Sequence, residues 1–146
     1  MREILFRGKK YKTSVFDETD WVYGSLIDSG NHEQVDIYPW LNGASTMSVR
    51  QLVYARMEAV KPETVGQFTG LTDKNGKKIF EGDIVQYYGT YALEVYMENG
   101  HTKIRWFDTV TNSVCKDMFF GYDPDAYGEC EVIGNIHDNP ELMEVK

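Results

Sequence analysis

The apolar residues of this chain fall into short runs separated by glycine, asparagine, aspartate or proline, a pattern typical of brief β-strands joined by tight turns. Strands are predicted over residues 3–7, 21–27, 34–38, 79–88, 92–98, 102–108, 113–120 and 129–136. No helical pattern of suitable length separates the later strands, so a parallel sheet is not expected. The pattern predicts a mainly β protein, with a small barrel or a strongly curled antiparallel sheet that limits exposed edges.

Residues 45–60 fit two periodicities at once. Apolar residues recur at helical spacing through this stretch, and Ser48 with Gln51 has the spacing of a capping box. From Val53 onward, however, apolar residues also alternate as they do in a strand. Periodicity alone leaves both the helix and the strand open for this segment.

Turn-forming residues mark the ends of several predicted strands. Three sequences are typical of hairpin tips, namely 73–76 (DKNG), 98–101 (ENGH) and 109–112 (TVTN). In the first of these, Asn75 and Gly76 are expected to adopt the left-handed backbone. Near the end of the chain, Asn139 followed by Pro140 predicts an N-cap with proline at the first helical position, and hence one short helical turn.

The chain has 146 residues, of which 42% are hydrophobic and 14% aromatic, and this suits one compact unit with its own core. We expect an N-terminal β-rich part, residues 1–61, and a C-terminal barrel part, residues 62–146. No apolar stretch reaches the length of a membrane span, and the beginning of the chain lacks the apolar core of a signal peptide. A cytoplasmic protein without a membrane partner is therefore expected.

The net charge of −8 is unevenly distributed along the sequence. Residues 1–62 carry eight basic and eight acidic side chains, whereas residues 63–146 carry seven basic and fifteen acidic ones. Such a field repels phosphate at long range, so nucleic acid is not an expected partner. The basic cluster near the N-terminus is interpreted as cationic side chains that protect an edge strand.

Residue types that carry chemistry are scattered rather than clustered. The three histidines, His32, His101 and His137, lie far apart in sequence and lack the spacing of a metal site. Cys115 and Cys130 are interpreted as buried or half-buried thiols. There is no glycine motif for binding nucleotide phosphates. We therefore assign no catalytic residue, no metal ligand and no cofactor.

Six residues form a candidate interaction surface, namely Trp21, Tyr23, Asp73, Lys74, Glu81 and Asp83. The two aromatic residues come from a predicted strand, where such side chains more often pack than recognise a partner. The carboxylates at positions 81 and 83 have a spacing that acid–base chemistry can use. The break at Gly82 favours a different role for them, in which they brace the turn by accepting backbone N–H groups.

Three sequence motifs carry a resemblance to a known family. The combination of LFRGKK and WVYGSLI with PETVGQFTGLTDKNGKKIFEGDIV (residues 62–85) and VIGNIHDNPELME resembles the YopX-like family of phage and prophage proteins. The resemblance implies a mainly β protein with an SH3-like or pseudo-barrel portion and no established activity, and it carries over no catalytic residues. In that family the stretch before PETVGQFTG looks like a strand, which favours β structure for residues 52–60.

The expected function is that of an accessory protein, encoded by a phage or prophage, that binds a macromolecule without catalysing a reaction. The expected partner is a host or phage protein in the bacterial cytoplasm, and the oligomeric state stays open. Two alternatives remain. One is an acidic inhibitor that imitates nucleic acid and occupies a host protein. The other is a hydrolase-type enzyme that uses Asp73, Glu81, Asp83 and a distant histidine.

Overall fold

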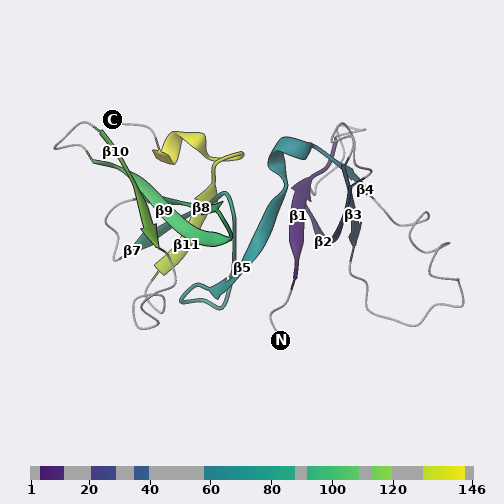
Figure 1. Cartoon of the computed structure of the whole chain (residues 1–146), viewed down its shortest axis with the longest axis horizontal. Helices are drawn as coiled ribbons and strands as arrows, with labels where there is room; N and C mark the ends of the chain where they lie inside the picture. The colour runs from purple at the N-terminus through teal and green to yellow at the C-terminus, as the bar shows by residue number, and fades with distance from the viewer. Residues whose placement is uncertain are drawn as a thin grey trace, which may run out of the picture. The chain divides into compact units, whose positions relative to one another are not determined.

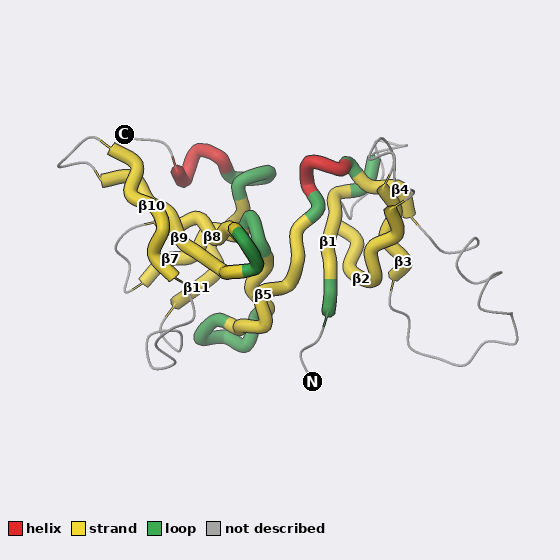
Figure 2. Tube along the Cα trace, in the orientation of Figure 1, coloured by secondary structure: helices red, strands yellow, loops and turns green. Residues whose placement is uncertain are grey.

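The computed structural model describes residues 4–11, 21–28, 35–39, 58–87, 92–108, 113–119 and 130–143. These residues form eleven β-strands and two 3₁₀ turns (Figure 1). Figure 2 shows that helical structure in the described part of the chain is confined to those two short turns. No helix among them is long and apolar enough to cross a membrane. The prediction of a mainly β protein with antiparallel strands is confirmed.

The chain divides into two compact units, residues 1–67 and residues 68–146, which we call the N-terminal and the C-terminal unit. The division falls within β5 (Gly66–Thr72), six residues after the boundary that we predicted between positions 61 and 62. β5 pairs with β1 through its first two residues and with β6 through later ones. Each unit is described by itself below.

The N-terminal unit is a sheet of short antiparallel strands. Its elements are β1 (Phe6–Lys9), β2 (Trp21–Asp28), β3 (Val35–Pro39), β4 (Glu58–Val60), the 3₁₀ turn η1 (Pro62–Thr64) and the start of β5. The strand order is β4-β3-β2-β1-β5. A cluster of apolar side chains lies on one face, and it comprises Val35, Ile37 and Val60 with Phe6, Val22, Leu26 and Val65 packed against them.

This sheet curls until β4, at one edge, reaches the end of β1. Lys10 forms a β-bridge with Val60, and the backbone N–H of Lys61 donates to the carbonyl of Lys9 at 2.8 Å. Gly8 permits the approach, because a Cβ atom at this position would lie 2.8 Å from the Val60 Cγ2 atom. The Thr64 hydroxyl completes the junction, since it accepts the Lys9 N–H at 2.8 Å.

The C-terminal unit contains a hairpin and a five-stranded sheet. Its elements are the rest of β5, β6 (Lys78–Phe80), β7 (Asp83–Tyr87), β8 (Ala92–Glu98), β9 (His101–Asp108), β10 (Ser113–Phe119), β11 (Cys130–Asn135) and the 3₁₀ turn η2 (Pro140–Met143). The sheet is antiparallel, with the order β10-β9-β8-β7-β11. Its core cluster comprises Ile79, Val85, Leu93, Val95, Ile104 and Cys130, with Leu71, Trp106 and Val132 packed against it.

Several turns and strands predicted from the sequence can be compared with the structure. The hairpin tip at 98–101 is confirmed, and η2 is the predicted C-terminal turn. The run predicted over 79–88 forms two strands, β6 and β7, and the predicted break at Gly82 between them is confirmed, with a φ of +90° at that residue. In the ambiguous segment, Glu58–Val60 is a strand, and residues 45–57 lie outside the described residues, as does the tip predicted at 109–112.

Candidate interaction surface

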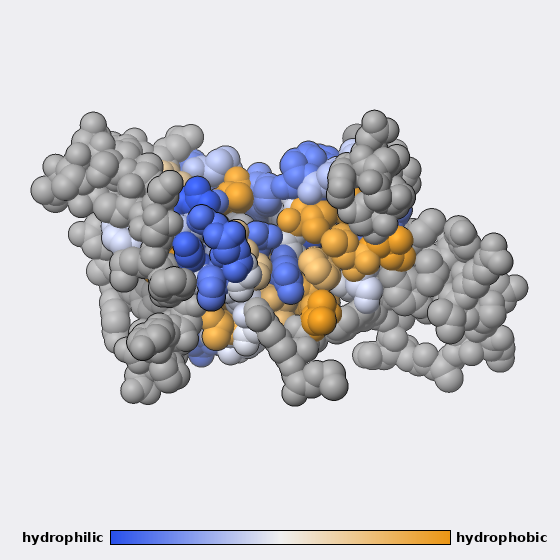
Figure 3. All heavy atoms as spheres, in the orientation of Figure 1, coloured by the Kyte–Doolittle hydropathy of each residue, from blue (hydrophilic) through white to orange (hydrophobic). Residues whose placement is uncertain are grey.

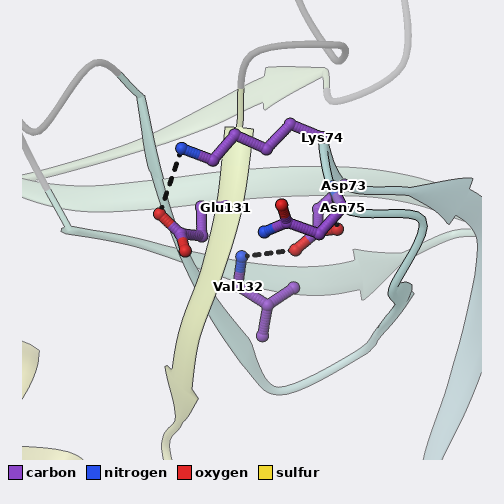
Figure 4. A network of polar contacts seen from close by, with 5 residues as sticks. All are labelled: Asp73, Lys74, Asn75, Glu131 and Val132. Atoms are coloured by element: carbon purple, nitrogen blue, oxygen red, sulfur yellow. Dashed lines mark hydrogen bonds and ion pairs between the residues drawn. The ribbon is translucent and has the colours of Figure 1, made fainter.

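Asp73 stands at the tip of the β5–β6 hairpin, yet its side chain is buried, with 6% of the residue exposed. Its Oδ1 atom accepts the backbone N–H groups of Asn75 and Lys77, both at 2.9 Å. Its Oδ2 atom accepts the N–H of Val132 on β11 at 3.0 Å (Figure 4). The carboxylate therefore holds its own turn in shape and ties that turn to a strand far along the chain.

The pKa of Asp73 reflects this environment. Burial of the carboxyl group raises the pKa, but the backbone N–H groups of Val132, Lys77 and Asn75, together with the charge of Lys77, outweigh burial and lower it below its ordinary value. A carboxylate kept ionised by several donors is a poor base. Asp73 therefore serves as a structural acceptor in this fold and is badly placed to take a proton from a substrate.

Lys74 continues the same contact along β11. Its backbone N–H donates to the Cys130 carbonyl at 2.9 Å, and its Nζ atom lies 3.3 Å from a Glu131 carboxylate oxygen. Figure 4 shows the Lys74 and Glu131 side chains reaching toward each other beside the β11 ribbon. Asp73 and Lys74 thus supply one acceptor and one donor to β11, much as a neighbouring strand would.

Glu81 and Asp83 occupy the turn between β6 and β7. Asp83 is 1% exposed, and its Oδ2 atom accepts the Phe80 N–H at 2.8 Å. Between them, the N–H of Gly82 donates to the Val95 carbonyl at 2.8 Å. The buried carboxylate of Asp83 is therefore engaged in the turn, whereas Glu81 is partly exposed.

A second polar network, at the end of β11, was missed by the sequence reasoning. The Oδ1 atom of Asn135 accepts the N–H groups of His137 and Asp138 at 3.0 and 2.9 Å. Asn139 lies against the backbone at Gly134, where an added Cβ would come within 2.5 Å of the Asn139 Oδ1 atom. The sequence signal was available, since an asparagine at the end of a strand commonly caps a turn through its own side chain.

The remaining reactive groups give no assembled centre in the described part of the chain. Cys130 is fully buried, and burial together with the nearby Asp73 charge raises the pKa of its thiol to about 11, so it stays protonated at neutral pH. Among residues that the structure describes, no three His, Cys, Asp or Glu side chains are placed to hold a metal ion. Residues 121–129 and His32 lie outside the described residues.

Trp21 and Tyr23 lie on β2, on the face of the N-terminal sheet that is opposite its apolar cluster. Their direct cross-strand neighbours on β1 are Lys9 and Arg7, in the pairs Lys9–Trp21 and Arg7–Tyr23. The Arg7 guanidinium carbon stands 4.6 Å from the centre of the Trp21 ring, which is the geometry of a cation–π contact. We call these four residues the cation–aromatic face.

The cation–aromatic face is partly open to solvent. Arg7 is nearly buried at 5% exposure, whereas Tyr23 is 45% exposed. Sequence reasoning selected the two aromatic residues but missed Arg7, because the basic cluster was interpreted as edge protection only. In the view of Figure 3, apolar residues gather on the N-terminal unit, and hydrophilic residues predominate among the coloured residues of the C-terminal unit.

These observations define a class, namely a two-unit, mainly antiparallel β protein whose buried carboxylates brace turns and whose N-terminal unit carries a cation–aromatic face. Within that class the chain belongs to the YopX protein family, whose family model matches residues 6–144. The family resemblance drawn from the three sequence motifs is therefore confirmed.

One solved structure gives a comparison of the fold. The chain is similar to protein EF1440 from Enterococcus faecalis, known from a crystal structure, with a TM-score of 0.51 and 22% sequence identity. The match covers 99% of this chain and 100% of that one. At this identity the likeness concerns the fold alone. A comparison with curated proteins gives no match.

Proposed function

We propose that this chain is an accessory protein of a phage or prophage that binds a host or phage protein in the bacterial cytoplasm and catalyses no reaction. Membership of the YopX family supports this setting. The roles of Asp73 and Asp83 support it as well, since both carboxylates accept backbone N–H groups inside turns. A carboxylate held in this way is not free to act on a substrate.

The cation–aromatic face is the observation that carries the proposal. Tryptophan, tyrosine and arginine are the residues most enriched at the energetic centres of protein interfaces. The Arg7 guanidinium already stacks on the Trp21 ring, so these two side chains lose little conformational freedom when a partner binds. The half-exposed Tyr23 next to them supplies a large contact area with few rotatable bonds.

A matched pair of exposed tyrosines allows a direct test. Tyr23 and Tyr11 are exposed to similar extents, at 45% and 50%. A photo-reactive phenylalanine derivative is placed at one position or the other, and the protein is irradiated in extract of a bacterial host. We expect a defined cross-linked protein from position 23 and none, or much less of it, from position 11.

The same experiment can contradict the proposal. No cross-linked protein from position 23, or equal and diffuse cross-linking from both positions, would reject binding through this face. Capture of a basic host protein that Tyr23→Ala does not weaken, and that moderate salt releases, would instead favour the acidic mimic of nucleic acid. The excess of acidic side chains over residues 63–146 is the feature on which that alternative rests.

A further inference from the structure

Two exposed turns of the C-terminal unit contain the dipeptide Asn-Gly, at positions 75–76 and 99–100. This dipeptide is chemically labile, because glycine has no side chain to hinder attack of its backbone nitrogen on the asparagine carboxamide. The product is a five-membered succinimide ring. How readily the ring closes depends on how freely the peptide between the two residues can rotate.

The backbone conformation of the β8–β9 turn favours this rotation. Asn99 has a φ of +52° and Gly100 a φ of +78°, and Glu98 pairs with His101 across the hairpin, which together describe a two-residue type I′ turn. Type I′ and type II′ turns share a positive φ at the first central residue and differ mainly in the orientation of the central peptide plane. That plane can therefore turn toward the Asn99 side chain while the strands on either side stay paired.

Open space surrounds the same turn. Both central residues are exposed, and a Cβ atom built on Gly100 would meet no atom within 4 Å. The Asn99 side chain can consequently reach the rotated Gly100 nitrogen without displacing another group. A Cβ atom built on Gly76 would likewise meet no atom within 4 Å, so the two turns differ in conformation and hydrogen bonding and not in open space.

The β5–β6 turn holds the equivalent peptide in place. The N–H of Gly76, which is the nitrogen that would attack, donates to the Asp73 carbonyl at 3.0 Å. The N–H of Asn75 donates to the Asp73 carboxylate at 2.9 Å, and Asn75 does not have a positive φ. Rotation of the 75–76 peptide breaks the first of these bonds, which adds to the barrier for ring closure.

We propose that Asn99 is a site of spontaneous deamidation and that Asn75, with the same neighbour, is protected. A base removes the proton from the Gly100 N–H, and the nitrogen forms a bond to the Asn99 Cγ atom. The bond from Cγ to the amide nitrogen breaks, and that nitrogen takes up a proton and leaves as ammonia. Water then opens the succinimide at either carbonyl, leaving aspartate or isoaspartate at position 99.

The modification changes both charge and geometry at the hairpin. A new carboxylate appears next to Glu98, whose own carboxylate lies 3.8 Å from the Lys103 Nζ atom. The isoaspartate form also inserts one methylene group into the main chain. A two-residue turn cannot absorb that extra atom without disturbing the pairing of Glu98 with His101.

The test compares the two sites within one molecule. The folded protein is incubated in heavy-oxygen water at mildly alkaline pH, and peptides that contain position 75 or position 99 are followed by mass spectrometry. We expect the peptide with Asn99 to convert about fivefold faster or more, the factor that corresponds to the loss of one neutral backbone hydrogen bond. In concentrated urea the two rates should converge, because only the local sequence then remains.

Equal rates in the folded protein, or faster conversion at Asn75, would overturn the proposal. A difference between the sites that persists in urea would also overturn it, since the cause would then lie in the neighbouring residues and not in the turns. The heavy oxygen identifies deamidation that occurs during the incubation and separates it from product present at the start.

Discussion

The Asp73 carboxylate makes contacts that no other side chain of similar size reproduces. We expect Asp73→Asn to lower the free energy of unfolding of the C-terminal unit by about 2–3 kcal/mol, because the new NH₂ group faces backbone N–H donors that lose their acceptor. Urea denaturation at neutral pH measures the change. Lys74→Ala is the control, since its ion pair with Glu131 is half exposed and worth at most about 1 kcal/mol.

The pH dependence of the same comparison follows from the lowered pKa of Asp73. A carboxyl group whose pKa is lower in the folded state contributes stability above its unfolded pKa, and that contribution is lost as the pH falls through the folded pKa. The difference in unfolding free energy between the natural chain and Asp73→Asn should therefore shrink under acidic conditions. A difference that stays constant down to strongly acidic pH would contradict the assigned role.

Position 8 requires glycine because of a close contact with Val60, and not because the backbone turns there. We expect Gly8→Ala to destabilise the N-terminal unit by about 1–3 kcal/mol, because the added Cβ would lie 2.8 Å from Val60 Cγ2. The double variant Gly8→Ala/Val60→Ala tests the cause. It should be more stable than the sum of the two single changes predicts, since the smaller side chain makes room for the added methyl group. Additive effects in thermal denaturation would contradict this explanation.

Single residues were only partly predictable from sequence. The tip at 73–76 and the left-handed Gly76 were predicted correctly, but Asn75 was wrongly given the left-handed backbone that occurs at Asn99. The reason is loop length, because Asp73 pairs with Lys77 to make a longer turn in which glycine alone needs a positive φ. The contact from Asp73 to Val132 spans 59 positions, and no local pattern reports it.

At the scale of elements, β11 is covered along one edge by a hairpin tip in place of a strand. We expect the Val132 amide to exchange its hydrogen slowly, because its N–H donates to the Asp73 carboxylate. In Asp73→Ala the same amide should exchange faster, while the Ile136 amide, which donates to the Gly82 carbonyl, should change much less. Nuclear magnetic resonance follows both amides, and equal acceleration would instead indicate global destabilisation.

Most elements of the sequence prediction agree with the structure where the structure describes them, and β8 matches at both ends. β1 was placed too early, over 3–7, whereas the strand runs from Phe6 to Lys9. The prediction followed the apolar run at 4–6, whereas the pairing with β2 continues through Gly8 and Lys9, which carry no apolar side chain. Cross-strand partners of this kind are invisible in one segment read alone.

For the whole molecule, the two compact units predict separable unfolding. In a Trp106→Phe variant all tryptophans lie in the N-terminal unit, whereas replacement of Trp21 and Trp40 by phenylalanine leaves only Trp106, which packs on the C-terminal core. During denaturation, Gly8→Ala should shift the fluorescence transition of the Trp106→Phe protein. It should leave the transition of the protein that keeps only Trp106 nearly unchanged. Identical shifts in both backgrounds would show that the two units unfold as one.

The division itself could not be located from composition. No run of proline, glycine or serine marks a linker, and the boundary falls between Gln67 and Phe68 inside a continuous strand. β5 can belong to both units because its two ends pair with different partners, β1 and β6. Length and composition suited one compact unit, and the change from the N-terminal to the C-terminal part was predicted between positions 61 and 62, six residues before the division.

The hairpin tips at 73–76 and 98–101 differ in what an engineer could add to them. A peptide tag inserted between Asn99 and Gly100 would extend into solvent, where neither residue is covered. The same tag between Lys74 and Asn75 would pull Lys77 away from the carboxylate that fixes it and uncover the edge of β11. One tip therefore accepts an affinity handle or a fluorescent label, and the other has a fixed length.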